Sequence, residues 1–169
     1  MGSSVSVSKD YLTFSAAHFL TIAGHKCESL HGHNYVVSVV VHGPVDPDTG
    51  FVVDFAVLKR ILRPVIDRLD HRVLVPAANP KVVALVEGDA TVIIYRGARR
   101  FEFPTAHVAM VPVTDTTAEL LAAFLATAMV DGLRVEGCHT ATSVLVDVEE
   151  SPGQSGRHQV NIEGGPRHD

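Results

Sequence analysis

The residues best suited to metal binding or proton transfer lie in one short stretch, residues 27–33, which reads Cys-Glu-Ser-Leu-His-Gly-His. It brings a thiol, a carboxyl group and two imidazoles together just before a strand-like run at 35–41. Successive side chains of a strand point to opposite faces, so His31 and His33 project the same way and could hold one metal ion. A His-x-His pair alone is a weak signal, and two solvent-facing strand residues would give the same pattern.

A third ligand for such an ion is His18, in the apolar, strand-compatible run 14–19. The polar stretch that follows contains Gly24 and can turn the chain back, so that His18 lies beside His33. Three histidines leave a fourth position open, which is typical of catalytic zinc rather than structural zinc. Imidazole suits zinc, copper, iron and nickel, so a metal that prefers oxygen ligands is less expected here. We therefore predict a Zn²⁺ site formed by His18, His31 and His33.

The elements that must position these groups are strands at 5–20 and 33–43 and two helices. Asp54 is suited to cap the first helix, because its carboxylate can accept a bond from a free backbone amide. The apolar residues that follow recur at helical spacing and predict one buried stripe. They are Leu58, Ile61, Leu62, Val65, Ile66 and Leu69.

The second helix begins at a capping box, Thr116 to Glu119, in which the two side chains each bind a backbone amide of the first turn. A strand at 140–150 follows, with Val144, Val146 and Val148 on one face. Period two places Glu150 on that same face. Its carboxylate must either reach water at the end of the strand or meet a buried polar partner.

The whole chain of 169 residues fits one domain, which we place at 1–151, with a flexible tail at 152–169 that is rich in Gly, Pro, His and Arg. A net charge of -5 gives no basic footprint for nucleic acid. No apolar run has the length of a membrane span, and the first residues lack the features of a signal peptide. We expect a cytoplasmic protein that binds neither nucleic acid nor membrane.

Five motifs in order resemble those of the 6-pyruvoyl-tetrahydropterin synthase and 6-carboxy-tetrahydropterin synthase family, over most of residues 14–151. They are Phe14-Ser-Ala-Ala-His18, Cys27-x-x-x-His31-Gly-His33-Asn-Tyr35, Gly50-Phe-Val-Val-Asp54-Phe-x-x-Leu58-Lys59, Leu69-Asp70-His71 and Thr117-Ala-Glu119. The resemblance implies an α+β tunnelling fold, or T-fold, with a four-stranded antiparallel sheet and two helices on one face. It also implies a homo-oligomer, commonly a hexamer, with sites between subunits.

The same resemblance implies roles for individual residues. Cys27, Asp70 and His71 would form a catalytic proton relay. Adjacent residues can hardly point at one spot, so we expect Asp70 to reach His71 only through its backbone or across a subunit boundary. Glu150 would anchor the pterin ring, with Glu149 as the alternative if the strand register slips. The Thr117 to Glu119 motif supplies two further substrate-binding candidates, Thr117 and Glu119.

The stretch 73–113 is longer than in compact family members and predicts an inserted β-hairpin region. Two interpretations stay open. The insertion could be an edge hairpin that shapes the assembly, or one of Arg96, Arg99 and Arg100 could contact a substrate phosphate.

The implied substrate is 7,8-dihydroneopterin triphosphate, and the leading reaction is a zinc-dependent lyase reaction that forms 6-carboxy-5,6,7,8-tetrahydropterin, an intermediate of 7-deazaguanine and queuosine synthesis. Elimination of triphosphate to 6-pyruvoyl-tetrahydropterin uses the same groups. Glu28 raises a third reaction, side-chain cleavage to 6-hydroxymethyl-dihydropterin, although it could equally be an exposed loop residue. A zinc-stabilised pterin-binding module without activity is the alternative from a different class.

Overall fold

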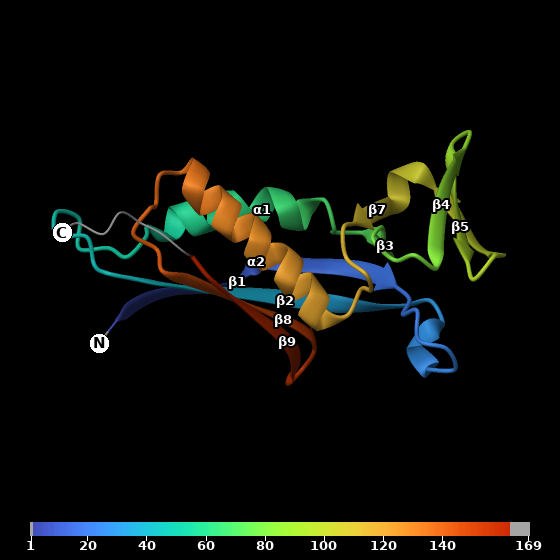
Figure 1. Ribbon diagram of the computed structural model, residues 1–169, viewed down its shortest axis with the longest axis horizontal. Coiled ribbons are helices and arrows are strands. Elements are labelled where there is room, and N and C mark those ends of the chain that lie inside the picture. Colours follow the sequence, from blue (N-terminus) through green and yellow to red (C-terminus); the bar gives the residue numbers. More distant parts are fainter. Residues whose placement is uncertain (1, 163–169) are drawn as a thin grey trace.

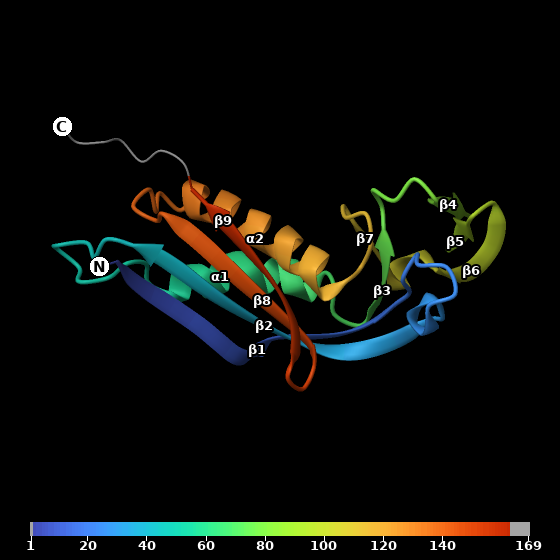
Figure 2. The same ribbon diagram turned by 60° about the horizontal axis from the view of Figure 1, so that its bottom comes forward.

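The computed structural model describes residues 2–162, and within them the main sheet has six strands in the order β7-β3-β1-β2-β8-β9 (Figures 1 and 2). Its antiparallel part consists of β1 (Ser3–His18), β2 (His31–Gly43), β8 (Ser143–Ser151) and β9 (Gln154–Asn161). β3 (Arg72–Pro76) and β7 (Val108–Val111) add a parallel edge. The α+β class is confirmed, but the sheet is mixed and larger than the four antiparallel strands we predicted.

Both helices cover one face of this sheet (Figure 1). Helix α1 (Phe55–Asp67) begins at Asp54, whose carboxylate accepts a bond of 2.7 Å from the Ala56 amide, as predicted. Helix α2 (Ala118–Val135) begins one residue later than predicted, because Thr117 is its N-cap and its hydroxyl accepts from the Leu120 amide. The predicted capping box from Thr116 to Glu119 is therefore wrong, and the Thr116 side chain is free for another role.

The core lies between the helices and the sheet, where the β2 side chains alternate between buried and accessible positions. The helices cross closely at Gly132, since a Cβ atom there would lie 2.3 Å from Cγ2 of Ile61. Gly132 lies inside α2 at this crossing. The apolar stripe of α1 is buried as its spacing predicts, through Leu58, Leu62, Val65 and Ile66.

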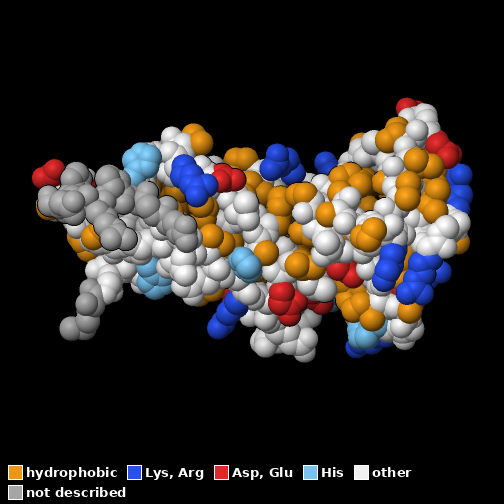
Figure 3. All heavy atoms as spheres, viewed as in Figure 1, with side chains coloured by type: hydrophobic (Ala, Val, Ile, Leu, Met, Phe, Trp, Pro, Cys, Tyr) orange, Lys and Arg blue, Asp and Glu red, His pale blue; other side chains and the backbone are white. Residues whose placement is uncertain are grey.

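The predicted inserted hairpin is a separate three-stranded antiparallel sheet, in the order β4-β5-β6. It comprises β4 (Val82–Glu87), β5 (Ala90–Tyr95) and β6 (Ala98–Pro104), and it is connected to the main sheet by β3 on one side and by a 3-10 turn, Thr105–His107, and β7 on the other. A small core holds it in place, with Phe19, Val75 and Ile93 at its centre. Val83, Leu85 and Val86 of β4 are exposed, and Figure 3 shows apolar side chains mixed with charged ones at this end of the molecule.

The segment predicted as a flexible tail forms the edge strand β9 over residues 154–161, paired with β8. Its Gly156 lies against the start of α2, where a Cβ atom would lie 2.3 Å from the Glu119 amide nitrogen. The main sheet thus extends past residue 151. Residues 163–169 of the predicted tail lie outside the described part of the chain. No helix among residues 2–162 combines the length and apolar character that crossing a membrane requires.

Candidate metal centre

Three histidine rings converge where β1 ends and β2 begins. The strand pairing places His18 opposite His31 and Ala16 opposite His33. The ring centroids of His18 and His31 are 4.5 Å apart, those of His18 and His33 are 5.3 Å apart, and one nitrogen from each ring lies within 4.8 Å of the others. The three residues that we predicted as ligands thus form one group that could hold a metal ion.

Hydrogen bonds leave the Nε2 atoms of this group available. Nδ1 of His18 lies 2.9 Å from the carbonyl oxygen of Thr116, and Nδ1 of His31 lies 2.7 Å from that of Ser29. A carbonyl only accepts, so each Nδ1 carries the proton and each Nε2 presents a lone pair. All three Nε2 atoms, including that of His33, are buried without a hydrogen-bond partner. Buried nitrogen lone pairs in a converging set fit a metal such as zinc.

His18 is the most deeply buried of the three ligands, with 1% of its surface exposed. Its burial, followed by the neighbouring charge of His31, lowers the pKa of His18 to about 4. The ring is consequently neutral at physiological pH, which is the form that binds a metal ion.

Thr116 is a site residue that the sequence interpretation missed, because we assigned it to a helix cap. It is fully buried, and its hydroxyl oxygen lies 3.1 Å from Nδ1 of His18 while the hydroxyl donates to the Phe19 carbonyl. Both oxygens of Thr116 thus orient the His18 ring. A second threonine directly before the helix cap is the only sequence signal that could have suggested this role.

Glu150 lies beside the histidine group, and Glu149 does not. Oε1 of Glu150 is 3.1 Å from Nε2 of His33, a distance that permits an ion pair, although the alignment is too poor for a hydrogen bond. Glu149 points elsewhere and accepts a bond from the Gly153 amide. The polar partner expected for a carboxylate at the end of the apolar row is therefore His33, one of the three candidate metal ligands. Burial, and then the charge of Glu150, raise the pKa of the neighbouring Tyr35 hydroxyl.

Asp70 and His71 interact directly through their side chains, contrary to our expectation. Oδ2 of Asp70 is 2.9 Å from Nδ1 of His71, and Oδ1 accepts from the Ser15 amide at 2.8 Å. Neighbouring side chains usually diverge, but His71 has a left-handed backbone with φ of 55°, which turns its ring back towards Asp70. The Ser15 amide, followed by His71, lowers the pKa of Asp70, which keeps the carboxylate charged.

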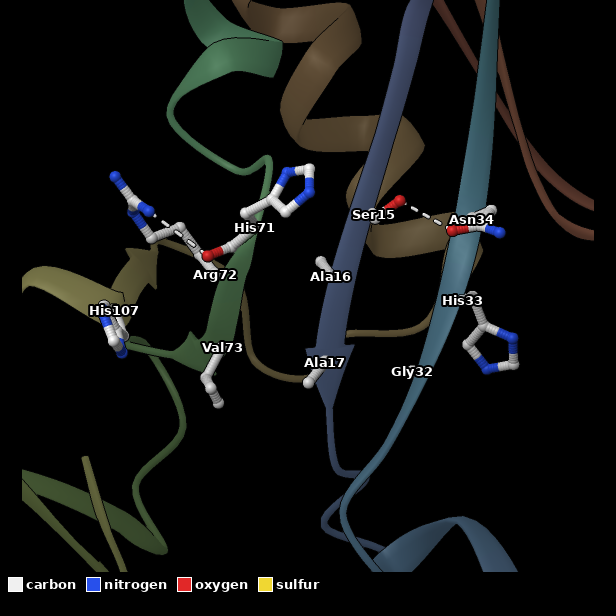
Figure 4. A pocket seen from close by; sticks show the side chains of 10 residues that line it. All are labelled: Ser15, Ala16, Ala17, Gly32, His33, Asn34, His71, Arg72, Val73 and His107. Atoms are coloured by element: carbon white, nitrogen blue, oxygen red, sulfur yellow. Dashed lines mark hydrogen bonds between the residues drawn. The ribbon is translucent and has the colours of Figure 1, made fainter. Parts of the chain in front are cut away.

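A cavity of about 660 Å³ is lined by residues of β1, β2 and β3, among them His71 and His33 (Figure 4). Figure 4 shows His71 between β3 and β1, while the His33 side chain lies on the far side of β2. Arg72 lines the cavity next to His71 and donates to its carbonyl oxygen at 3.2 Å. His33 thus lines the cavity from β2, but its ring points away from His71.

Cys27 lies apart from that cavity, in a short 3-10 turn, Lys26–Glu28. Its thiol is half-buried, and its carbonyl oxygen accepts from the Leu20 amide at 2.8 Å. Within residues 2–162 it makes no hydrogen bond to Asp70 or His71. The structure therefore brings together two members of the predicted relay, Asp70 and His71, and leaves Cys27 separate.

The other predicted substrate contacts have local partners. The Glu28 carboxylate accepts from the Gly24 amide at 3.0 Å and closes its own loop. Thr117 caps α2, and Glu119 is exposed in the first turn of that helix.

The inserted arginines also have partners within their own sheet. Arg99 pairs with Glu87 and Glu102, while Arg96 and Arg100 lie over the rings of Tyr95 and Phe101.

Comparisons with known proteins agree with this architecture. The chain is 31% identical over 153 residues to a Methanocaldococcus jannaschii protein named "Putative 6-carboxy-5,6,7,8-tetrahydropterin synthase", covering 90% of this chain and 92% of that protein. It is 42% identical over 60 residues to the dihydroneopterin monophosphate aldolase of Pyrococcus furiosus, covering 36% of this chain and 49% of the aldolase.

Among solved structures, the chain superimposes on a catalytic-residue variant of Plasmodium vivax 6-pyruvoyltetrahydropterin synthase, in which a glutamate is replaced by alanine. The TM-score is 0.86 at 26% identity, with 96% of this chain and 99% of that chain covered. A family model described as 6-pyruvoyl tetrahydropterin synthase matches residues 6–159. The chain belongs to the 6-pyruvoyl tetrahydropterin synthase family.

Proposed function

We propose that this protein is a zinc-dependent lyase that converts 7,8-dihydroneopterin triphosphate to 6-carboxy-5,6,7,8-tetrahydropterin. The observation that carries the proposal is the group of three buried Nε2 atoms of His18, His31 and His33, which have no hydrogen-bond partner within the described chain. These residues would hold the ion and leave a position open for substrate. A bound zinc ion supplies Lewis acidity for the oxygens of the substrate side chain.

Asp70 and His71 are our candidates for moving protons. Asp70 is fixed to β1 by the Ser15 amide, and its second oxygen holds Nδ1 of His71. This arrangement keeps the proton on Nδ1, so that Nε2 can accept or return a proton at a carbon of the substrate side chain. The exposed ring of His71 can reach a substrate in the adjacent cavity.

Cys27 is the proposed general base on the metal side. Its turn precedes His31 by four residues, and a thiol beside a bound cation loses its proton more readily. Because the structure separates Cys27 from His71, we propose that one site takes Cys27 from one copy of the chain and His71 from another, in a homo-oligomer such as a hexamer.

Glu150 is proposed to anchor the pterin, since its carboxylate lies at the edge of the metal group and could accept two bonds from the donors of the ring. Thr117 and Glu119, at the start of α2, are proposed as additional substrate contacts. The name of the M. jannaschii relative supports the 6-carboxy product for this chain.

Glu28 supports a second candidate, cleavage of a dihydroneopterin side chain to 6-hydroxymethyl-dihydropterin. The P. vivax relative has a catalytic glutamate, and the P. furiosus relative is an aldolase. Glu28 lies in the same turn as Cys27, so either could serve the same metal centre. The name of the P. vivax relative likewise keeps elimination of triphosphate to a 6-pyruvoyl product as an alternative.

Product analysis by mass spectrometry tests the proposal. Zinc-loaded protein incubated with 7,8-dihydroneopterin triphosphate should give the 6-carboxy product together with acetaldehyde and triphosphate. A 6-pyruvoyl or 6-hydroxymethyl product would replace the proposed reaction by one of the alternatives. A fully metallated protein that yields no product would instead favour a pterin-binding module.

A further inference from the structure

The link between β7 and α2 holds the oxygens that orient His18, and a series of buried and part-buried hydrogen bonds fixes this link. The Thr116 amide donates to Oδ1 of Asp115 at 2.9 Å. Oδ2 of Asp115 accepts from both the amide and the hydroxyl of Thr21, at 3.0 and 2.7 Å. Asp115 thereby links Thr116, which orients His18, to Thr21, which lies three positions after His18.

Asn79 extends this series to the start of the inserted segment. It lies between β3 and β4, and 7% of its surface is exposed. Its Nδ2 donates to the Thr21 hydroxyl at 2.8 Å and to the Thr114 carbonyl at 2.5 Å, while Oδ1 accepts from the Lys81 amide at 2.9 Å. The Asn79 side chain therefore connects the inserted segment with Thr21, in the chain after His18, and with Thr114, in the link before α2.

The donor and the acceptor of each bond in this series can be assigned. The Asn79 amide donates to the Thr21 oxygen, the Thr21 hydroxyl donates to Asp115, and His18 donates from Nδ1 to Thr116. A buried polar network in which each of these donors has an acceptor fixes a single arrangement of the chain. Removing one member leaves a buried group unpaired and allows the others to shift.

We propose that Asn79, Thr21 and Asp115 form a positioning network for the metal ligand His18, through which the inserted segment sets the metal affinity of the site. The inference rests on the metal centre of the proposed function. Groups that orient a metal-bound histidine usually change metal affinity about 10- to 100-fold when they are removed. This network would act at one remove, through the carbonyl and hydroxyl of Thr116.

The test compares zinc affinity, measured by competition with a chromophoric chelator, in wild-type protein and in the variants Asn79→Ala and Thr21→Val. Valine has the shape of threonine but lacks the hydroxyl. Both variants should bind zinc about 10- to 100-fold more weakly and should alter the visible absorption spectrum of the cobalt-substituted protein. Thr21→Ser, which keeps the hydroxyl, should restore both properties.

Asp54→Ala is the matched control, because it removes a polar side chain that caps α1 and has no bond to the network. It should lower stability without changing zinc affinity or the cobalt spectrum. If Asn79→Ala does not fold, Thr21→Val carries the test alone.

Folded Thr21→Val protein with wild-type zinc affinity and an unchanged cobalt spectrum would overturn the inference and leave the metal centre intact. Wild-type protein that binds neither zinc nor cobalt would overturn the proposed function itself.

Discussion

The carboxylate of Asp70 holds the ring of the next residue, His71, at 2.9 Å, while its other oxygen is bound to the Ser15 amide. The His71 amide in turn donates to the Ser15 carbonyl at 2.7 Å. Both residues are thus fastened to one position of β1. The left-handed backbone of His71 makes this geometry available to neighbours in sequence.

Asp70→Asn should lower kcat by roughly 100-fold or more, which is the usual contribution of a positioned acid or base. An asparagine side chain has one oxygen, so it cannot accept from both Ser15 and His71, and its amino group opposes one of these donors. Zinc content and oligomeric state should match those of wild type. An unchanged kcat with full zinc content would remove Asp70 from the proton relay.

The pKa of His18 makes the stability of the metal-free protein depend on pH. Burial lowers this pKa from 6.5 to about 4, so between those values the unfolded chain binds a proton that the folded chain does not. The stabilisation is complete above pH 6.5 and is lost as the pH falls towards 4, up to about 3 kcal/mol in total. Urea unfolding of the chelator-treated protein over this range measures it.

The control for that experiment is His18→Asn, whose Nδ2 can keep the bond to the Thr116 carbonyl but cannot take up a proton. The variant should show a shallower loss of stability over the same pH range. A wild-type slope in this variant would assign the pH dependence to other histidines.

Cys27 and Glu28 can be separated by their products. Cys27→Ala should retain zinc and abolish formation of the 6-carboxy product. Glu28→Ala should still form that product, because the Glu28 carboxylate accepts a bond from the Gly24 amide of its own loop. Mass spectrometry of both reactions gives the result. Persistent 6-hydroxymethyl-dihydropterin in Cys27→Ala, lost when Glu28 is also replaced, would show that Glu28 supports a second reaction.

The sequence predicted the parts of the fold that repeat over short distances. The stripe of α1 and the His31 and His33 pair follow from helical and strand periodicity, and the Asp54 cap follows from local hydrogen bonding. Strand β9 has no such pattern, since exposed Arg157, His158 and Gln159 follow one another with no apolar residue between them. Its position depends on pairing with β8, which periodicity does not report.

The missed features of the site have a similar cause. The bond between Asp70 and His71 needs a backbone conformation that is unusual for a residue other than glycine, and nothing in the local sequence signals it. Thr116 lies 98 positions from His18, so their hydrogen bond exists only after β1 and the start of α2 have come together. The third candidate ligand, His18, could be predicted from the sequence, because its place beside His33 needs only one turn of the chain and because it lies in a motif of the family.

Gly156→Ala should destabilise the protein by about 1–3 kcal/mol, because a methyl group would meet backbone rather than a movable side chain. The added Cβ would lie 2.3 Å from the Glu119 nitrogen and 2.4 Å from the Ala118 carbonyl carbon. The midpoint of urea unfolding measures the loss, with Gln159→Ala, an exposed residue of the same strand, as control. Equal midpoints for the two variants would mean that β9 does not pack on α2 in solution.

The proposed sharing of sites between copies of the chain can be tested by mixing two inactive variants. Cys27→Ala and His71→Ala homo-oligomers should each be inactive, since each lacks one member of every site. If a site takes Cys27 from one copy and His71 from another, random exchange of subunits restores about a quarter of the sites, because each copy is intact for its own role half of the time.

Denaturing the two variants together and refolding them in equal amounts allows the exchange, and the same treatment of each variant alone is the control. Recovery of about a quarter of the activity of refolded wild type is expected. A site built within one chain predicts no recovery at all, because no chain in the mixture carries both residues. That result, with zinc content intact and subunit exchange verified by mass spectrometry, would place Cys27 and His71 in the same subunit's site and require the turn at 26–28 to move towards β3.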